Sequence, residues 1–152
     1  TFQTRWNHHF TELNGTSRLA YRYYSDNWGI RSHTMDAEWV QRLGGGWSVA
    51  PAVRYYSQTA AKFYVEVDPT LAPFPTTPPA DARYFSEDQR VSAFGGLTVG
   101  MKLVKQLSLD TKVDLKFEQY GQKGVWSLMG SGSKGLAPFY ARSLQVGLTH
   151  TF

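Results

Sequence analysis

The stretch SLDTKVDLKFEQY, residues Ser108 to Tyr120, decides the fold. Charged side chains take every second position with alternating sign, and most positions between them are apolar. The charged residues are Asp110, Lys112, Asp114, Lys116 and Glu118, and the apolar ones are Leu109, Val113, Leu115 and Phe117. In a helix, neighbours four residues apart would be like charges that repel. In a β-strand, successive side chains point to opposite faces, so one face is charged and the other apolar. The stretch therefore predicts a strand.

The same alternation recurs along most of the 152 residues and predicts about seven strands. Their connections fall at 14–15, 25–32, 44–46, 60–85, 104–106 and 121–138, so that short ones alternate with long ones. Transmembrane β-barrels of the outer-membrane type have short periplasmic turns and long extracellular loops. We therefore predict an all-β fold, in which residues 1–152 form an antiparallel transmembrane β-barrel domain or the C-terminal portion of one, with 60–85 and 121–138 as long extracellular loops. Within one strand, Pro51 lacks an N–H and predicts a bulge.

Composition narrows the class of protein further. The absence of cysteine excludes disulfides and thiolate metal sites. No window of about 18 consecutive apolar residues exists, so a transmembrane helix is not expected, whereas a barrel strand needs only alternate apolar residues. The net charge is +4, but the basic residues form no runs, so no nucleic-acid partner is predicted. A soluble antiparallel barrel or sandwich that binds an apolar ligand stays open as the alternative.

The last residues of the chain carry a second signal for a barrel. Four apolar side chains share one face of the predicted final strand: Leu144, Val146, Leu148 and Phe152. This set looks like the C-terminal signature by which the barrel-assembly machinery recognises outer-membrane barrels for insertion. It predicts outer-membrane lipid and that machinery as partners, and the bacterial outer membrane as the location.

Charged side chains on the inward register of the predicted barrel are the candidate functional residues. They are Arg18, Arg22, Asp36, Glu38, Arg42, Arg54, Arg90, Lys102, Asp110, Lys112, Asp114, Lys116 and Glu118, with Arg5 in the same register. Basic residues are in excess, so a wide water-filled lumen lined in this way would favour anions. A narrow lumen would instead be crosslinked by ion pairs and would conduct nothing.

Four segments taken together resemble a known family. They are YRYYSDN from Tyr21, VRYYSQTAAKFY from Val53, YFSEDQRVSAFGGLTVGMKL from Tyr84 and MGSGSKGLAPFYARSLQVGLTHTF from Met129. They are similar to the C-terminal half of an uncharacterised Gram-negative outer-membrane barrel family, catalogued as domain of unknown function thirty-five seventy. The resemblance implies the terminal portion of a longer barrel protein without established catalytic residues. It also implies an envelope lipoprotein or other subunits of a redox-linked complex as partners.

Two function classes follow for such a barrel. The first is a porin-like channel or transport barrel for small anionic solutes, and the alternative is a non-conducting structural barrel that scaffolds an envelope complex. An enzyme, a metal site and a cofactor are not predicted, because no catalytic constellation can be assembled and the adjacent His8 and His9 point to opposite faces of a strand.

The directions of the predicted strands bear on closure of the barrel. Each connection reverses the direction of the chain, so the first and the last of seven strands run parallel to each other. Single-chain bacterial barrels instead close antiparallel with an even strand number. We therefore expect that residues 1–152 do not close a barrel alone.

Overall fold

A computed structural model describes residues 1–67 and 80–151, which fold into one β-sheet with two single-turn helices. The strands are β1 (Phe2–Phe10), β2 (Gly15–Ser25), β3 (Arg31–Gly44), β4 (Trp47–Gln58), β5 (Phe94–Gln106), β6 (Thr111–Lys123) and β7 (Phe139–His150). The 3₁₀ helices are η1 (Gln89–Val91) and η2 (Gly124–Trp126). Among the described residues, no helix has the length and apolar character needed to span a membrane.

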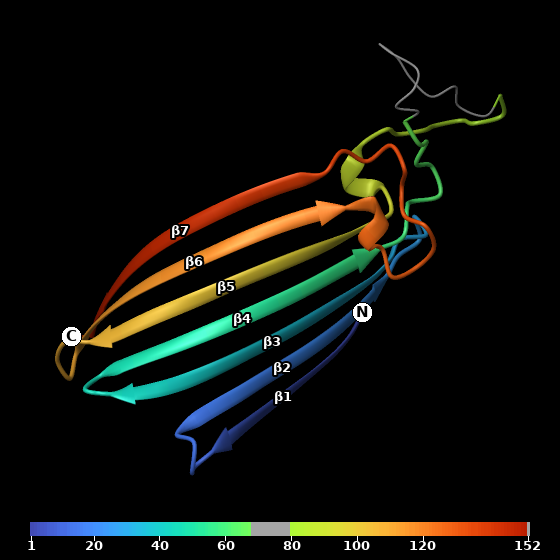
Figure 1. Ribbon diagram of the computed structural model, residues 1–152. Helices are drawn as coiled ribbons and strands as arrows, with labels where there is room; N and C mark the ends of the chain where they lie inside the picture. The colour runs from blue at the N-terminus through green and yellow to red at the C-terminus, as the bar shows by residue number, and fades with distance from the viewer. Residues whose placement is uncertain (68–79, 152) are drawn as a thin grey trace.

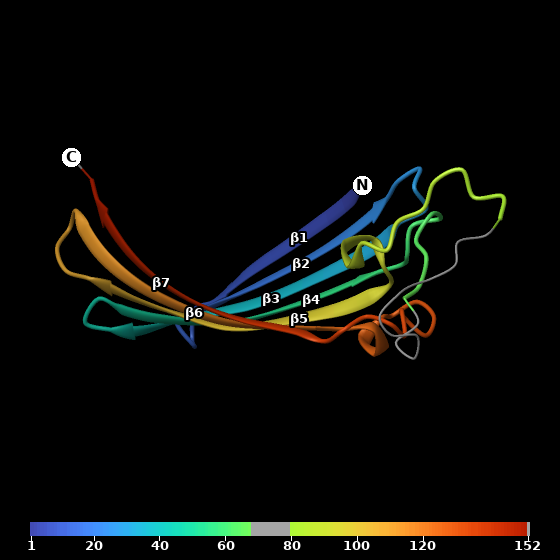
Figure 2. The same ribbon diagram turned by 90° about the horizontal axis from the view of Figure 1, so that it is seen from above.

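All seven strands lie in sequence order, and every neighbouring pair is antiparallel (Figure 1). Within the described residues, β1 pairs only with β2 and β7 only with β6, so the sheet is open. Figure 2 shows that the sheet is twisted and curved rather than flat. The predicted all-β antiparallel fold is confirmed, and so is the expectation that these strands leave two unpaired edges.

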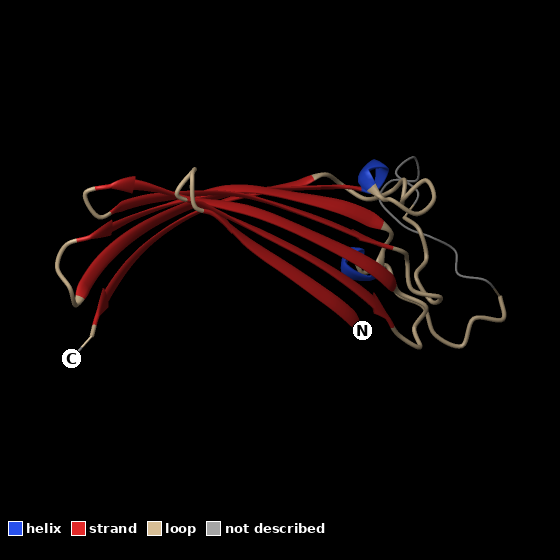
Figure 3. Ribbon diagram, turned by 90° about the horizontal axis from the view of Figure 1, so that it is seen from below, coloured by secondary structure: helices blue, strands red, loops and turns tan. Residues whose placement is uncertain are grey.

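The connections are sorted to opposite ends of the sheet. Short turns at 11–14, 45–46 and 107–110 lie at one end, which we call the turn end. The connections 26–30 and 124–138, and residues 59–67 and 80–93 of the connection between β4 and β5, lie at the other end, the loop end, together with both 3₁₀ helices (Figure 3). At the first turn, Asn14 takes a φ of 48°, a left-handed conformation that Asn tolerates better than most residues.

The strand registers divide the side chains between two faces of different chemistry, because directly paired residues share a face. One registered row runs Arg5, Ala20, Asp36, Arg54, Thr98, Tyr120, and it belongs to what we call the polar face. The next row runs Trp6, Leu19, Ala37, Val53, Val99, Gln119, and it belongs to the apolar face. In β6, Lys112, Asp114, Lys116 and Glu118 fall on the polar face, and Val113, Leu115 and Phe117 on the apolar face.

Burial on the two faces is the reverse of that in an ordinary domain. In the edge strand β7, Leu144, Val146 and Leu148 are 68%, 75% and 72% exposed, and on the apolar face of the inner strand β6, Leu115 and Phe117 are each 43% exposed. On the polar face of β6, the side chains of Asp114 and Glu118 are only 18% and 29% exposed. Large apolar side chains are normally the most buried in a folded domain, so the apolar face lacks a covering layer among the described residues.

Side-chain burial concentrates at the loop end instead. The buried apolar residues there are Ile30, Ala61, Phe94 and Leu136, and the buried polar ones include Ser57, Gln58, Ser92 and Ser133. Glycines let backbones approach one another: a Cβ on Gly132 would lie 1.9 Å from the carbonyl oxygen of Gly124, and one on Gly135 equally close to that of Val67. The long connections are therefore packed against each other where the structure describes them.

The backbone N–H groups of Lys134 and Gly135 both point to one carboxylate oxygen of Glu66. Successive backbone N–H groups in such a turn form a site for an anion, and here the anion is a side chain of the same chain. This contact ties the connection 124–138 to the connection 59–93.

Three local expectations are wrong. Arg90 lies in η1 rather than in a strand, because β5 begins only at Phe94. Asp110 and Leu109 lie in the turn 107–110, because β5 continues to Gln106 and β6 begins at Thr111. Pro51 marks no bulge: its pairing with β5 is continuous, and the register with β3 is the same on both sides of Ala50 and Pro51, the two positions without a registered partner there. The irregularity of this hairpin lies between Arg42 and Gly44.

The two glycines that precede Ser131 and Ser133 provide a matched test of loop packing. Gly130 and Gly132 both have positive φ, but a Cβ on Gly130 meets nothing within 4 Å. Both alanine variants carry the backbone strain, and only G132A adds a steric clash. We expect G132A to lower the free energy of unfolding by roughly 1–3 kcal/mol more than G130A, measured by urea titration. Equal losses would contradict the packed loop.

Candidate functional site

The polar face carries a series of ion pairs along the sheet. Two of them join β2, β3 and β4: Arg18 Nη1 lies 3.4 Å from Glu38 Oε1, and Arg54 Nε lies 2.5 Å from Asp36 Oδ1. Nearer the turn end, Lys102 Nζ of β5 lies 3.4 Å from Asp114 Oδ2 of β6. All these partners are directly or diagonally opposed across the ladder, which is the geometry in which charged pairs stabilise a sheet.

Along β6 the charge ladder of the opening stretch pairs with itself. Lys116 Nζ lies 2.9 Å from Glu118 Oε1, two residues further on the same face. Lys116 also stands opposite Lys102 in the register. The carboxylates of Asp114 and Glu118 therefore separate ammonium groups that would otherwise repel one another.

A hollow of about 420 Å³ lies on the polar face toward the loop end. Its charged lining is Arg5, Arg22 and Arg54 against the single carboxylate of Asp36. Its neutral polar lining is Gln3, Thr34, Tyr56, Thr98 and Tyr120. Arg54 is engaged by Asp36, whereas Arg22 only donates a 3.4 Å hydrogen bond to the hydroxyl of Thr34. Three guanidinium groups around one carboxylate make the hollow attractive to an anion.

Most of the sequence-predicted charged residues lie on this polar face. The set that the strands place there is Arg18, Arg22, Asp36, Glu38, Arg42, Arg54, Lys102, Lys112, Asp114, Lys116 and Glu118, together with Arg5. Basic side chains outnumber acidic ones on it. Asp110 and Arg90 are the exceptions, for the reasons given above. On the opposite face lie Leu144, Val146 and Leu148 of the terminal signature, while Phe152 lies outside the described residues.

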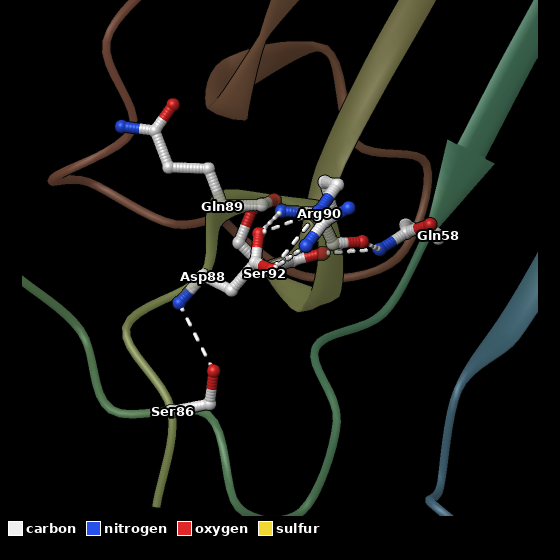
Figure 4. Close-up of polar contacts among 6 residues, drawn as sticks. All are labelled: Gln58, Ser86, Asp88, Gln89, Arg90 and Ser92. Carbon is white, nitrogen blue, oxygen red and sulfur yellow. Dashed lines mark hydrogen bonds and ion pairs between the residues drawn. The ribbon is translucent and has the colours of Figure 1, made fainter.

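Arg90 takes part in a separate polar cluster at the loop end (Figure 4). Its guanidinium donates to both carboxylate oxygens of Asp88, and its backbone carbonyl accepts from Gln58 Nε2 at 2.9 Å. Gln58 Nε2 also donates to the carbonyl of Ser92 at 2.7 Å. The hydrogen bonds from the Arg90 side chain and backbone hold the pKa of the Asp88 carboxyl below its usual value. Gln58 thus anchors the connection 59–93 to the end of β4.

Sequence reasoning missed this anchoring role. Gln58 and Ser92 lie almost fully buried, but Gln58 stands just before the predicted loop 60–85, where polar residues are ordinary, and Ser92 is a polar position of the alternating segment that follows this loop. No local pattern in the sequence distinguishes these two residues from their polar neighbours. Buried polar side chains need partners, and here the partners are backbone carbonyls that only the fold brings close.

The histidines do not form a joint site. His8 stacks against Trp6 on the apolar face, with ring centroids 5.5 Å apart, whereas His9 on the polar face bonds to the hydroxyl of Thr16. His33 pairs with Tyr21 on the apolar face, opposite to the face that carries Asp36 and Glu38. Over the described ranges 1–67 and 80–151, no cluster of three or more His, Cys, Asp or Glu side chains could hold a metal ion.

A family model described as "Protein of unknown function (DUF3570)" matches residues 1–142. The match begins well before the segments that suggest the family in the sequence, so it includes β1 and β2 as well. No curated protein and no solved structure matches the chain.

The contact between Asp88 and Arg90 predicts a specific titration. A carboxyl with a lowered folded-state pKa contributes stability above its ordinary pKa near 4, and this contribution is lost as the pH falls through the lower folded-state value. In a carboxyl NMR titration, Asp88 should therefore protonate at lower pH than in the unfolded chain. R90Q should move its midpoint back toward the ordinary value, and R83Q should leave it in place. An unchanged midpoint in R90Q would show that another group lowers this pKa.

Proposed function

Since this chain belongs to the DUF3570 family of proteins of unknown function, we propose its role from its geometry: the sheet forms part of the wall of a porin-like β-barrel in the bacterial outer membrane. Its apolar face contacts lipid, and its polar face lines a water-filled interior. The barrel admits small anionic solutes.

The observation that carries the proposal is the reversed burial of the two faces. Leu144, Val146 and Leu148 stand exposed, while Asp114 and Glu118 on the other side of the sheet are better shielded. In water, leaving a Leu or Val side chain exposed forgoes roughly 1.5–3 kcal/mol of burial energy for each. In a bilayer the same side chains meet hydrocarbon, and the charged residues stay on the wet side.

Preference for anions rests on the excess of basic groups on the polar face. Four ion pairs neutralise part of it. Among the described residues, Arg5, Arg22, Arg42 and Lys112 form no ion pair, and two of these guanidinium groups, on Arg5 and Arg22, line the hollow. A passage lined with uncompensated positive charge concentrates anions and excludes cations.

The open edges define what else the barrel needs. Unpaired N–H and C=O groups cannot face hydrocarbon, because each would cost several kcal/mol. The outer edges of β1 and β7 therefore pair with further strands beyond these seven, and the terminal strand engages the barrel-assembly machinery. An envelope lipoprotein or another subunit of a complex is a further partner in this proposal.

A non-conducting structural barrel is the second candidate, and the packed loop end favours it. The connections 59–67 and 124–138 are tied together by Glu66. The hydroxyl of Tyr55 in β4 donates to the carbonyl of Trp126 in η2, and Leu128 N after η2 donates to Ser57 Oγ of β4. Loops fixed in this way at one end of a barrel would narrow the passage. Such a barrel would conduct no solute and would serve as a scaffold for a redox-linked complex of the cell envelope.

Adjacent residues of β6 test which face contacts lipid. L115R places a guanidinium on the apolar face near mid-strand and should destabilise the membrane-inserted protein by roughly 2–4 kcal/mol. K116Q removes one exposed ion pair on the polar face and should cost about 1 kcal/mol or less. Urea unfolding of each variant in lipid vesicles measures the two losses. Similar losses in the two variants would refute the assignment of the faces.

Planar-bilayer recordings on the native protein separate the two functions. We expect anion-selective conductance, and a permeability ratio of anion to cation that falls by about twofold or more in R5Q/R22Q, because these arginines line the hollow. R142Q removes the same kind of charge from the apolar face and should leave the ratio unchanged. Absence of conductance in the native protein would favour the structural scaffold. An equal change of the permeability ratio in the polar-face and apolar-face variants would exclude the hollow as the element that selects anions.

A further inference from the structure

Every charged strand residue on the apolar face is basic. These residues are Arg31, Lys105, Lys123 and Arg142, while the acidic residues of the described strands, Asp36, Glu38, Asp114 and Glu118, all lie on the polar face. The basic residues also lie toward the ends of their strands, and the middle of the apolar face is left without charge. A sheet surface that only had to stay in water would have no reason to exclude acidic residues.

Three of these basic residues lie toward the loop end, and two of them flank an aromatic pair there. Lys123 Nζ lies 5.1 Å from the ring centroid of Trp126 and 5.9 Å from that of Tyr140. Arg142 follows Tyr140 by two residues on the same face of β7. We call Lys123, Trp126, Tyr140 and Arg142 the basic–aromatic cluster.

A glycine makes room for this cluster. Gly121 pairs directly with Tyr140 in the register, and a Cβ placed on Gly121 would lie 3.3 Å from the rings of both Trp126 and Tyr140. The backbone of Trp126 is held by Tyr55, whose hydroxyl donates to the Trp126 carbonyl. The aromatic rings are therefore fixed beside the ammonium group of Lys123 by contacts from three strands.

The cations of this cluster are not neutralised by the residues that the structure describes. On the polar face, Lys102 and Lys116 each lie within 4 Å of a carboxylate. Within the described part of the chain, neither Lys123 nor Arg142 forms an ion pair. Ring contacts orient a Lys ammonium but leave its charge uncompensated, so the cluster attracts an external anion.

The turn end offers an instructive comparison. Lys105 Nζ lies 4.8 Å from the centroid of the Trp47 ring on the apolar face, but it also donates a 2.8 Å hydrogen bond to the carbonyl of Gly45. Its ammonium is partly satisfied by its own turn. The loop-end cluster has two basic residues, and the ammonium of its lysine donates no hydrogen bond within residues 1–67 and 80–151, so it is the stronger anion site.

We propose that the basic–aromatic cluster binds the phosphate group of an anionic membrane lipid in the leaflet at the loop end. This inference rests on the proposed membrane function. The rings of Trp126 and Tyr140 lie at the level of the headgroups, as aromatic residues do at membrane interfaces, while Lys123 and Arg142 pair with the phosphate. The lipid chains then cover Leu144, Val146 and Leu148 below the cluster.

The test compares lipid binding to the complete barrel, including the strands that pair with β1 and β7, reconstituted in phosphatidylcholine vesicles and in vesicles that also contain phosphatidylglycerol. Native mass spectrometry measures which lipid stays bound after extraction. In wild type we expect retention of phosphatidylglycerol over phosphatidylcholine, and in K123Q/R142Q we expect this preference to fall roughly tenfold. R42Q/K112Q removes the same net charge from the polar face and should keep the preference. Inorganic phosphate at millimolar concentration should not displace the lipid.

The other possible outcomes contradict different parts of the proposal. Equal retention of both lipids, or an equal loss of preference in the two double variants, would overturn the lipid site while leaving the membrane function intact. Displacement by inorganic phosphate would show a site for free anions instead of lipid. Failure of the wild type to insert into either kind of vesicle would overturn the proposed function itself, and this inference with it.

Discussion

The register of the antiparallel sheet is the constraint on which the other features depend. Because paired residues share a face, a ladder that is regular except between Arg42 and Gly44 assembles most charged side chains of six strands into one surface and most apolar side chains into the other. A shift of one residue in any strand would exchange its two faces. The ion pairs from Arg18 to Glu38 and from Lys102 to Asp114 form only in the observed register, so the polar face itself helps to fix it.

The sheet has little core of its own, and this changes where its stability arises. Side-chain burial is concentrated at the loop end around Ala61, Phe94 and Leu136, where glycine contacts and buried serines hold the long connections together. The sheet extends from this packed end toward the short turns with both faces uncovered. In the proposed membrane setting, lipid supplies the missing contact on the apolar face, and the cationic ends of that face match the charge of the headgroups.

The strands were predictable from the sequence because their signal is local. Alternation through Lys112 to Glu118 identifies β6, and the same pattern places Leu144, Val146 and Leu148 on one face of β7. The ends of strands were less predictable: Asp110 continues the alternation of charge but lies in a turn, and Arg90 precedes apolar residues but lies in a helical turn held by Asp88 and Gln58. Hydrogen bonds between Ser108 and Thr111 close the turn that contains Asp110, and Arg90 is held by the nearby Asp88 and the distant Gln58. A period of two reveals neither set of contacts. The hollow was not predicted either, since it depends on how Arg5, Arg22 and Arg54 converge across the curved sheet.

The central claim is that the apolar face contacts lipid while the polar face contacts water, and the absence of cysteine makes it directly measurable. A nitroxide label attached to single cysteines introduced at successive positions from Ser143 to Thr149 in the membrane-inserted protein reports collision rates with oxygen and with a water-soluble nickel complex. The proposal predicts strict alternation, with Leu144, Val146 and Leu148 accessible to oxygen, and Gln145 and Gly147 accessible to nickel. Uniform accessibility to the nickel complex along β7 would contradict it.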